Sequence, residues 1–165
     1  MITEITTVVE AGEGAVLDVL GPRIEPLTSR EESAYCVMKG TMPPAVSVPL
    51  HSHEDAESFY VLSGEIQGLV QTERGLEWQT LKPGDFVHVT SGAKHAWRNL
   101  SHERSEVLIT CTAKLGRFFR EVGRPASDRQ TPMQEQVRGL AEISERYGYW
   151  MGSPEENAAV GISLL

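Results

Sequence analysis

Short apolar runs separated by turn residues dominate the chain from about residue 15 to residue 113. Nine of these runs predict β-strands, because alternating or β-branched residues bounded by Gly, Pro, Asn and Asp are typical of strands. They cover residues 15–20, 23–27, 33–42, 58–62, 65–72, 76–81, 86–89, 96–100 and 106–112. Many short strands with no helical pattern between them favour an all-β sandwich or closed barrel over a parallel sheet.

From residue 115 onward the hydrophobic period changes to that of helices. Leu115, Phe118, Phe119 and Val122 predict a first helix that ends near Gly123, and residues 124–129 are expected to form a linker. Thr131 as N-cap, Pro132 in the first turn and Gln134 at the capping-box position predict a second helix, which Gly148 ends. The segment Ser153-Pro154-Glu155-Glu156 repeats the same start signal for a short last helix.

These patterns divide the chain into three parts. Residues 1–14 form an N-terminal segment, residues 15–113 a β domain, and residues 114–165 a helical extension that packs on the β domain or on a partner subunit. A length of 165 residues fits one compact unit of this kind, and 40% hydrophobic content is enough for a core.

Charge narrows the classes of partner. The net charge is −8, and the Lys and Arg residues are scattered without a basic run, which argues against nucleic acid and against an anionic membrane surface. No run approaches the ~20 apolar residues of a spanning helix, and residues 1–6 lack the features of a secretory signal. We therefore expect a cytoplasmic protein. Cys36 and Cys111 lie in apolar strand-like runs and are expected to be buried free thiols.

The candidate chemistry lies in two spaced blocks. The first runs His51-x-His53-x3-Glu57-x6-Gly64, and the second runs Gly84-x5-Thr90-x-Gly92-x2-His95-x3-Asn99. Residues two apart in an extended segment share a face, so His51 and His53 point the same way. Three imidazoles and one carboxylate suit a divalent transition metal. A single His-x-His pair is weak evidence, but the second block is independent of the first. We therefore predict His51, His53, Glu57 and His95 as metal ligands.

The two blocks resemble the two motifs of the cupin family. His51, His53, Glu57 and Gly64 match the first motif, whose leading glycine is replaced here by the Pro-rich segment Met42-Pro43-Pro44. The second motif matches with Thr90 in place of a proline. This resemblance implies a jelly-roll β-barrel over roughly residues 15–113, with one divalent metal (Fe, Mn, Ni, Cu, Co or Zn) inside it, and a homodimer, which an exposed edge strand would also favour. The whole chain is more loosely similar to single-domain cupins related to quercetin (flavonol) dioxygenases.

Other residues near the blocks have a structural explanation beside a functional one. Phe59 and Trp97 share strand faces with Glu57 and His95, so we predict them as substrate contacts, although plain core packing would explain them too. Val61 is assigned to the core. The remaining assignments place His88 and Tyr60 outside the site, His102 in solvent, Asn99 in a turn, and Glu54-Asp55 as a solvated turn at the cavity mouth.

Three functions remain open at this level. The first is a metal-dependent dioxygenase that acts on a small aromatic or enol-type molecule. The second is a metal-dependent isomerase or lyase on a small oxo or hydroxy acid, for which the metal would act as a Lewis acid. The third is a non-catalytic small-molecule-binding module. Glu57 would serve as a ligand or, if it dissociates, as a base, and no separate general base is identifiable.

Overall fold

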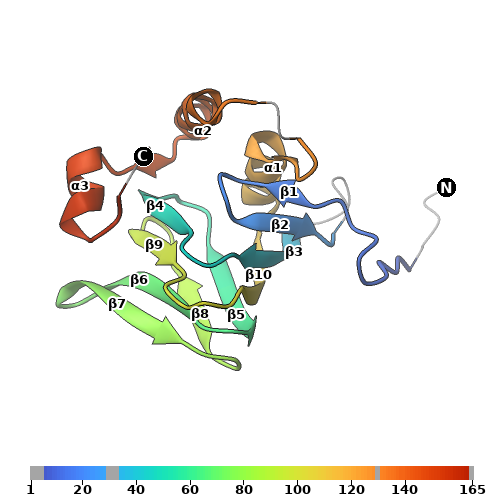
Figure 1. Ribbon diagram of the computed structural model, residues 1–165, viewed down its shortest axis with the longest axis horizontal. Helices are drawn as coiled ribbons and strands as arrows, with labels where there is room; N and C mark the ends of the chain where they lie inside the picture. The colour runs from blue at the N-terminus through green and yellow to red at the C-terminus, as the bar shows by residue number, and fades with distance from the viewer. Residues whose placement is uncertain (1–5, 29–33, 129–130, 164–165) are drawn as a thin grey trace.

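Twelve strands and three helices make up the described part of the chain, which covers residues 6–28, 34–128 and 131–163 of this computed structural model. The strands form two antiparallel sheets, as Figure 1 shows. The N-terminal residues 1–5, on which the absence of a secretory signal was judged, lie outside the described residues. None of the described helices is long and apolar enough to cross a membrane.

The larger sheet has seven strands in the order β11-β1-β2-β3-β10-β5-β8. Its members are β1 (Leu17–Asp18), β2 (Arg23–Pro26), β3 (Tyr35–Met42), β5 (Glu57–Ser63), β8 (Phe86–Val89), β10 (Ser105–Thr112) and β11 (Arg124–Pro125). The long strands β3 and β10 pair in continuous register from Cys36 opposite Cys111 to Met42 opposite Ser105. Both cysteines are free and buried, as expected.

The smaller sheet has five strands in the order β12-β4-β9-β6-β7. They are β4 (Ser47–Ser52), β6 (Ile66–Thr72), β7 (Gly75–Leu81), β9 (His95–Arg98) and β12 (Trp150–Met151). The all-β prediction is confirmed as two facing antiparallel sheets. Among the described strands no pairing joins the two sheets, so the closed barrel stays a prediction.

The core lies between the inner faces of the two sheets. Period-two alternation buries one side of the long strands β3, β5 and β10, for example Glu57, Phe59 and Val61 on β5, while Tyr60 between them is 44% exposed. Trp97 of the smaller sheet packs into the same core from the opposite side. A second small cluster around Leu69 and Ala96 covers the other face of the smaller sheet. This alternation is what aims every second residue of β5 and β9 inward.

Strand β4 is absent from the nine predicted strands, and the reason is Pro49. A proline has no N–H to donate to a ladder and is disfavoured in the middle of a sheet. The pairing of β4 with β9 shifts register between Val48 and His51, so Pro49 sits at an irregularity where a ladder bond is not required. Strand β4, which carries the candidate ligand His51, is therefore not predicted from residue propensities.

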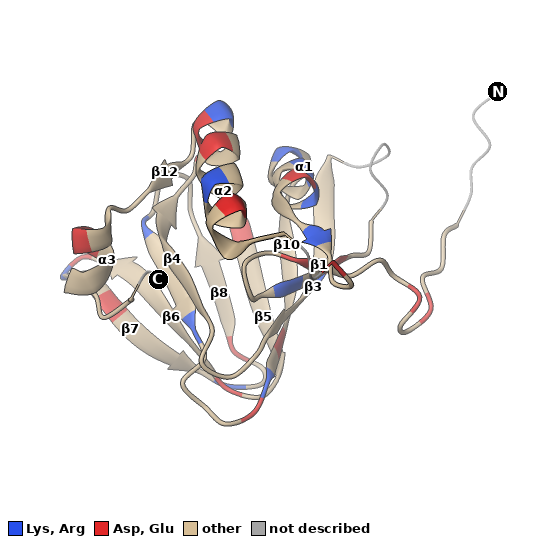
Figure 2. Ribbon diagram, turned by 45° about the horizontal axis from the view of Figure 1, so that its top comes forward, with Lys and Arg blue, Asp and Glu red and all other residues tan. Residues whose placement is uncertain are grey.

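The helices follow the prediction with local differences. They are α1 (Ala113–Val122), α2 (Met133–Tyr147) and α3 (Pro154–Ala159), and α1 and α2 lie side by side above the sheets (Figure 1). Gly148 ends α2 with φ 75°, and Ser153 with Glu156 forms the expected capping box of α3. Charges of both signs alternate along the outer surfaces of α1 and α2 in Figure 2.

Two predictions about the C-terminal part are wrong. Thr131 does not cap α2, which begins after Pro132 without a side-chain cap. The Thr131 hydroxyl instead accepts a hydrogen bond from Arg124 and donates one to Asp128. The expected linker at 124–129 contains β11, which pairs with β1, and β12 pairs with β4. The C-terminal extension thus contributes a strand to each sheet, while the division of the chain into domains stays a prediction.

Gly64 joins β5 to β6 in a conformation that only glycine tolerates well. Its φ is +71°, and a Cβ built there would lie 2.5 Å from the Arg104 carbonyl oxygen. Gly84 also has a positive φ, +95°, but nothing lies within 4 Å of a Cβ built on it. Alanine substitutions at Gly64 and Gly84 can therefore separate the cost of backbone strain from the cost of steric collision.

We expect Gly64→Ala to lower the free energy of unfolding by about 2–4 kcal/mol, because strain and collision add. Gly84→Ala should cost about 1–2 kcal/mol, the strain alone. Urea unfolding followed by circular dichroism measures both. Equal losses in the two variants would show that the contact with the Arg104 carbonyl relaxes freely.

Candidate metal centre and cavity

The four predicted ligands come from three segments that the sheets bring together. His51 lies near the end of β4, His53 just beyond it, Glu57 at the start of β5, and His95 at the start of β9. His51 is the register partner of His95 across the β4–β9 pair. Gly92, with φ +77°, donates its N–H to the His53 carbonyl at 2.8 Å, which ties the two sequence blocks together.

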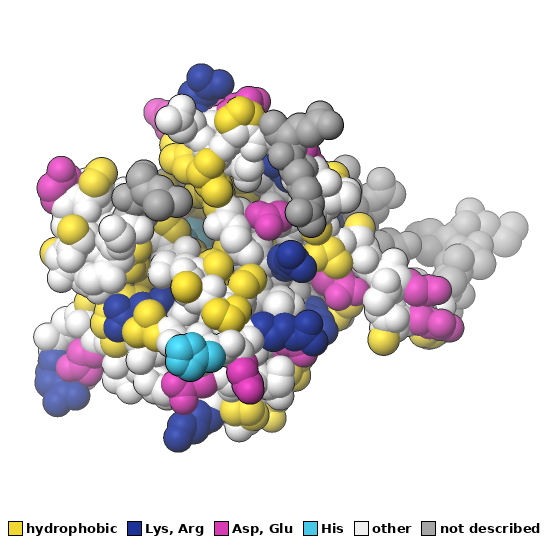
Figure 3. Space-filling model, viewed as in Figure 1, with side chains coloured by type: hydrophobic (Ala, Val, Ile, Leu, Met, Phe, Trp, Pro, Cys, Tyr) yellow, Lys and Arg dark blue, Asp and Glu magenta, His cyan; other side chains and the backbone are white. Residues whose placement is uncertain are grey.

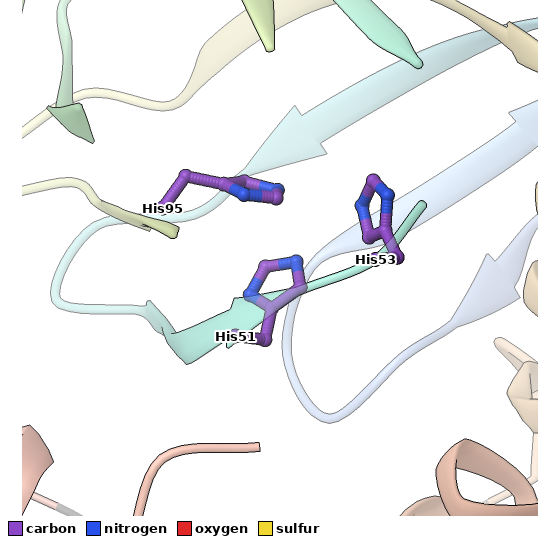
Figure 4. A group of neighbouring side chains, drawn as sticks. All are labelled: His51, His53 and His95. Carbon is purple, nitrogen blue, oxygen red and sulfur yellow. The ribbon is translucent and has the colours of Figure 1, made fainter. Parts of the chain in front are cut away.

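The three histidine rings face one another. Their centroids are 4.1 Å apart for His51 and His95, 5.0 Å for His53 and His95, and 5.6 Å for His51 and His53. One donor nitrogen from each ring lies within 4.8 Å of the other two. Figure 4 shows the rings turned toward a common point.

Each ring is fixed by a hydrogen bond from its Nδ1 atom to a backbone carbonyl. His51 bonds the carbonyl of Pro49 at 2.8 Å, His53 that of Asp55 at 2.7 Å, and His95 that of Ala93 at 2.9 Å. A carbonyl only accepts, so Nδ1 carries the proton, and in the neutral form of each ring Nε2 keeps a free lone pair. Backbone partners of this kind are the usual second shell of metal-bound histidines.

Two of the Nε2 atoms form no hydrogen bond, although a carboxylate lies close to both. His53 Nε2 and His95 Nε2 are buried and have no hydrogen-bond partner among the described residues. Buried polar atoms without a partner are costly, and they are few in folded proteins. Their lone pairs converge beside a carboxylate, which is an arrangement that a cation between them would stabilise.

Glu57 supplies that carboxylate and is only 3% exposed. Its Oε2 atom lies 3.4 Å from His53 Nε2 and 3.7 Å from His95 Nε2. Two donors that bind one metal at ~2.1 Å stand ~3.0–4.2 Å apart, depending on the angle between them. Both distances fall within that range for Glu57 with His53 and His95, but among the described residues the group of donor atoms that lie within 4.8 Å of one another comprises the three histidines only. Glu57 as the fourth ligand stays a prediction.

The ionisation of these groups reflects the same geometry. Burial lowers the pKa of His51 to about 3, so that this ring is a neutral donor. Burial raises the pKa of Glu57, but the neighbouring His53 and His95 outweigh it and hold the value at about 2. For His53, burial lowers the pKa, yet the adjacent Glu57 outweighs it and the net shift is upward. The pocket therefore holds a carboxylate that attracts positive charge.

The donors open onto a largely apolar cavity of about 130 Å³. Phe59 and Trp97 both line it, with ring centroids 4.2 Å apart, so the two predicted substrate contacts lie in its wall. Val61, assigned to the core, is buried but is not part of this wall. The remaining wall comes from outside the two sequence blocks. It includes residues of strands β3, β4, β6 and β10, together with Val19 and Leu20 near β1, Leu115 and Phe118 of α1, and Leu140 and Ser144 of α2.

The other singled-out residues lie away from the donors. His88 is exposed on the outer side of β8, where its Nδ1 bonds the Ser58 hydroxyl at 2.8 Å. His102 is also exposed. Asn99 is fully buried and donates to the Met42 and Glu103 carbonyls, which confirms its role in a turn.

Asp55 is the residue that sequence reasoning misplaced. It is 8% exposed rather than solvated, and its carboxylate accepts hydrogen bonds from Thr112 at 2.5 Å and Tyr149 at 2.7 Å. Burial raises the pKa of Asp55, but these two hydrogen bonds outweigh it and lower the pKa. The Tyr149 ring stands 5.4 Å from that of His53. Asp55 thus holds His53 through its backbone and the C-terminal segment through its side chain.

Neither Tyr149 nor Thr112 carried a sequence signal for this role. They lie 94 and 57 residues from Asp55 in the chain, and neither falls in a spaced motif. Alternation along 106–112 placed Thr112 only at a strand end. The one available hint was the acidic pair itself, because a carboxylate two residues from a ligand is well placed to support it.

A family model described as a cupin domain matches residues 38–111, a stretch that contains all four candidate ligands. A curated relative, the quercetin 2,3-dioxygenase of Bacillus subtilis (strain 168), is 29% identical over 134 residues, which are 79% of this chain and 38% of that protein. The chain therefore spans well under half of the length of this relative.

Solved structures share the fold at lower identity. The structure of KdgF from Halomonas sp. matches with a TM-score of 0.57 and 17% identity, over 66% of this chain and 94% of that one. A predicted oxalate decarboxylase from Thermotoga maritima matches with a TM-score of 0.57 and 23% identity, over 64% and 98% of the two chains. At these identities the likeness concerns the fold alone.

We expect Tyr149→Phe to lower the free energy of unfolding by about 1–3 kcal/mol, because it leaves a buried carboxylate oxygen of Asp55 without its donor. Tyr147→Phe is the matched control. It removes a hydroxyl that bonds the exposed Glu121, and surface changes of that kind stay within about 0.5 kcal/mol. Urea unfolding compares the two, and an equal effect would mean that the Asp55 contact contributes nothing special.

Proposed function

Because residues 38–111 of this chain form a cupin domain, we propose that His51, His53, Glu57 and His95 bind one divalent transition metal. We further propose that the protein is a metal-dependent enzyme for a small aromatic or enol-type molecule, working as a dioxygenase. The observation that carries the metal site is the convergence of three Nδ1-anchored histidines on one point beside a buried carboxylate.

The donor set suits several metals. Three neutral imidazoles and one carboxylate match Fe, Mn, Ni, Cu, Co and Zn, and relative affinity is no guide to which one a cell supplies. A bound metal of this group would polarise a substrate oxygen and, if it is redox-active, bring O₂ and substrate together. Because four protein ligands bring only one negative charge, the loaded site would retain positive charge and favour an anionic oxygen of the substrate.

The side chains around the donors have separate tasks in this proposal. The Phe59 and Trp97 rings, which touch each other, would together form one apolar side of the ligand site, and the apolar wall would exclude water from it. Glu57 would act as a ligand, or accept a substrate proton at Oε2 if it leaves the metal. The Asp55 carbonyl would hold His53 in the tautomer that presents Nε2.

The choice of dioxygenase over the other reactions rests on the curated relative. That protein is a quercetin 2,3-dioxygenase, and its 29% identity extends over most of this chain. The cupin fold hosts many chemistries, so fold likeness adds nothing to this choice. An isomerase, a lyase and a non-catalytic binding module are the outcomes against which the dioxygenase is tested.

Removing a ligand should abolish metal binding. We expect the wild-type protein to take up about one metal ion per chain. His51→Ala and Glu57→Ala should each weaken binding by at least ~10- to 100-fold, the loss that changes in the second shell alone cause. Elemental mass spectrometry after dialysis measures the content. His88→Ala, which changes an exposed histidine outside the cavity, should bind like wild type, and normal metal content in the ligand variants would refute the site.

Oxygen dependence separates the candidate reactions. We expect protein reconstituted with iron, nickel or manganese to consume O₂ in the presence of a flavonol, a catechol or a diketone, and to lose this activity in Glu57→Gln. An oxygen electrode combined with product mass spectrometry measures both. Turnover that persists under nitrogen would identify an isomerase or lyase instead, and tight binding of an unchanged ligand would identify a binding module.

A further inference from the structure

Ser144 presents a hydroxyl that the protein does not use. It lies on α2, is 1% exposed, and its Oγ has no hydrogen-bond partner among the described residues. A serine inside a helix usually bonds the carbonyl four residues back, but no such bond forms here. Burying an unpaired hydroxyl costs about 1–3 kcal/mol by protein mutational data, so the position calls for a partner.

The same residue lines the cavity that contains the metal donors. Leu140 lies one helical turn before it and lines the cavity too, so this face of α2 forms part of the wall. In Figure 3 hydrophobic side chains gather along the side of α2 that faces the sheets, at the rim of a hollow. Ser144 is therefore a polar group set in an apolar wall.

A short chain of contacts connects Ser144 to the metal donors. The Tyr149 N–H donates to the Ser144 carbonyl at 2.9 Å, and the Tyr149 ring stands 5.4 Å from the ring of His53. The Phe118 ring, 4.9 Å from that of Tyr149, continues the wall toward α1. The hydroxyl of Tyr149 is already bonded to Asp55, so it is not free for a ligand.

The volume of the cavity indicates what fits wholly inside it. Its volume of about 130 Å³ is close to that of a ~150 Å³ protein cavity that accommodates one benzene ring. Whereas a larger ligand such as a flavonol would extend out of its open side, a single-ring ligand fits wholly inside it. Its two ends would face different chemistry, the metal donors on one side and the Ser144 hydroxyl on the other.

We propose that Ser144 determines specificity by hydrogen bonding a polar substituent of a single-ring ligand whose metal-binding oxygens face His51, His53 and Glu57. The inference rests on the proposed metal site. It goes beyond it by assigning the ligand class, an amphiphilic one-ring molecule, and by assigning the residue that distinguishes its substituted end.

Two catechols of nearly equal shape test this assignment. In 4-(hydroxymethyl)catechol the ring carries a hydroxyl on a methylene, and in 4-ethylcatechol a methyl replaces that hydroxyl. Binding is measured by calorimetry to the Co²⁺-loaded protein under nitrogen. We expect wild type to prefer the hydroxymethyl compound by about 3- to 10-fold, the effect of one hydrogen bond, and Ser144→Ala to bind both compounds within about twofold.

Ser105→Ala is the matched control. Ser105 is also buried with an unpaired Oγ, but it does not line the cavity. This variant should keep the wild-type preference, and both variants should keep the wild-type Co²⁺ affinity. Both should also unfold at the wild-type temperature or above it, since neither loses a hydrogen bond.

Each failure has a distinct meaning. If wild type shows no preference, if Ser144→Ala retains it, or if neither catechol binds the loaded protein, the assignment of Ser144 is overturned while the metal site stands. A clear drop in the unfolding temperature of Ser144→Ala alone would also overturn it, because the hydroxyl would then have a structural partner. A wild-type protein that takes up no Co²⁺ overturns the metal site together with this inference.

Discussion

Three hydrogen bonds from histidine Nδ1 atoms to backbone carbonyls set the chemistry of the cavity, because they decide where three lone pairs point. An imidazole that is free to rotate or to change tautomer would find a donor elsewhere. Here the carbonyls of Pro49, Asp55 and Ala93 remove that freedom, and Glu57 closes the group with its charge. The surrounding strands serve to bring those carbonyls and that carboxylate to one place.

The remainder of the chain supports this centre through long-range contacts. The bond between Tyr149 and Asp55 closes a loop of 94 residues, and the two short strands β11 and β12 add the C-terminal segment to both sheets. Asp55 connects the two systems, since its backbone bonds a candidate ligand and its side chain bonds the C-terminal segment. The helices are therefore a wall of the cavity and not an appendage to a finished β domain.

The cavity wall combines residues from inside and outside the stretch that matches the cupin domain, and this bears on which ligand the cavity accepts. All four candidate ligands lie within the stretch that matches the cupin domain, whereas Val19, Leu115, Phe118, Leu140, Ser144 and Tyr149 lie outside it and still line the cavity. In the proposed function, the stretch that matches the cupin domain would supply the metal donors together with Phe59 and Trp97, while the flanking segments complete the wall around the ligand. Function in such folds belongs to the site rather than to the architecture.

The sequence by itself determined the elements whose signals are local. Alternation predicted most of the strands, the glycines at 64 and 148 predicted a turn and a helix end, and the spacing of His51, His53, Glu57 and His95 predicted their convergence. The strands, the turn and the helix end depend on residues a few positions apart. The convergence of His95 with the other three, which lie in a separate block, was expected from the ligand types and from the resemblance of the two blocks to the cupin motifs.

Only the tertiary structure decided the features that join distant segments. Strand β4 was not predicted because it contains Pro49. A proline is tolerated in this strand only because the pairing with β9 shifts register there. Asp55 was expected in a solvated turn, but it is buried, and its carboxylate accepts hydrogen bonds from Thr112 and Tyr149, which are remote in the chain. Ser144 lies inside the predicted second helix, where no local signal distinguishes it. That its hydroxyl is buried, unpaired and in the cavity wall depends on how α2 packs over the sheets, and no spacing along the chain encodes that packing.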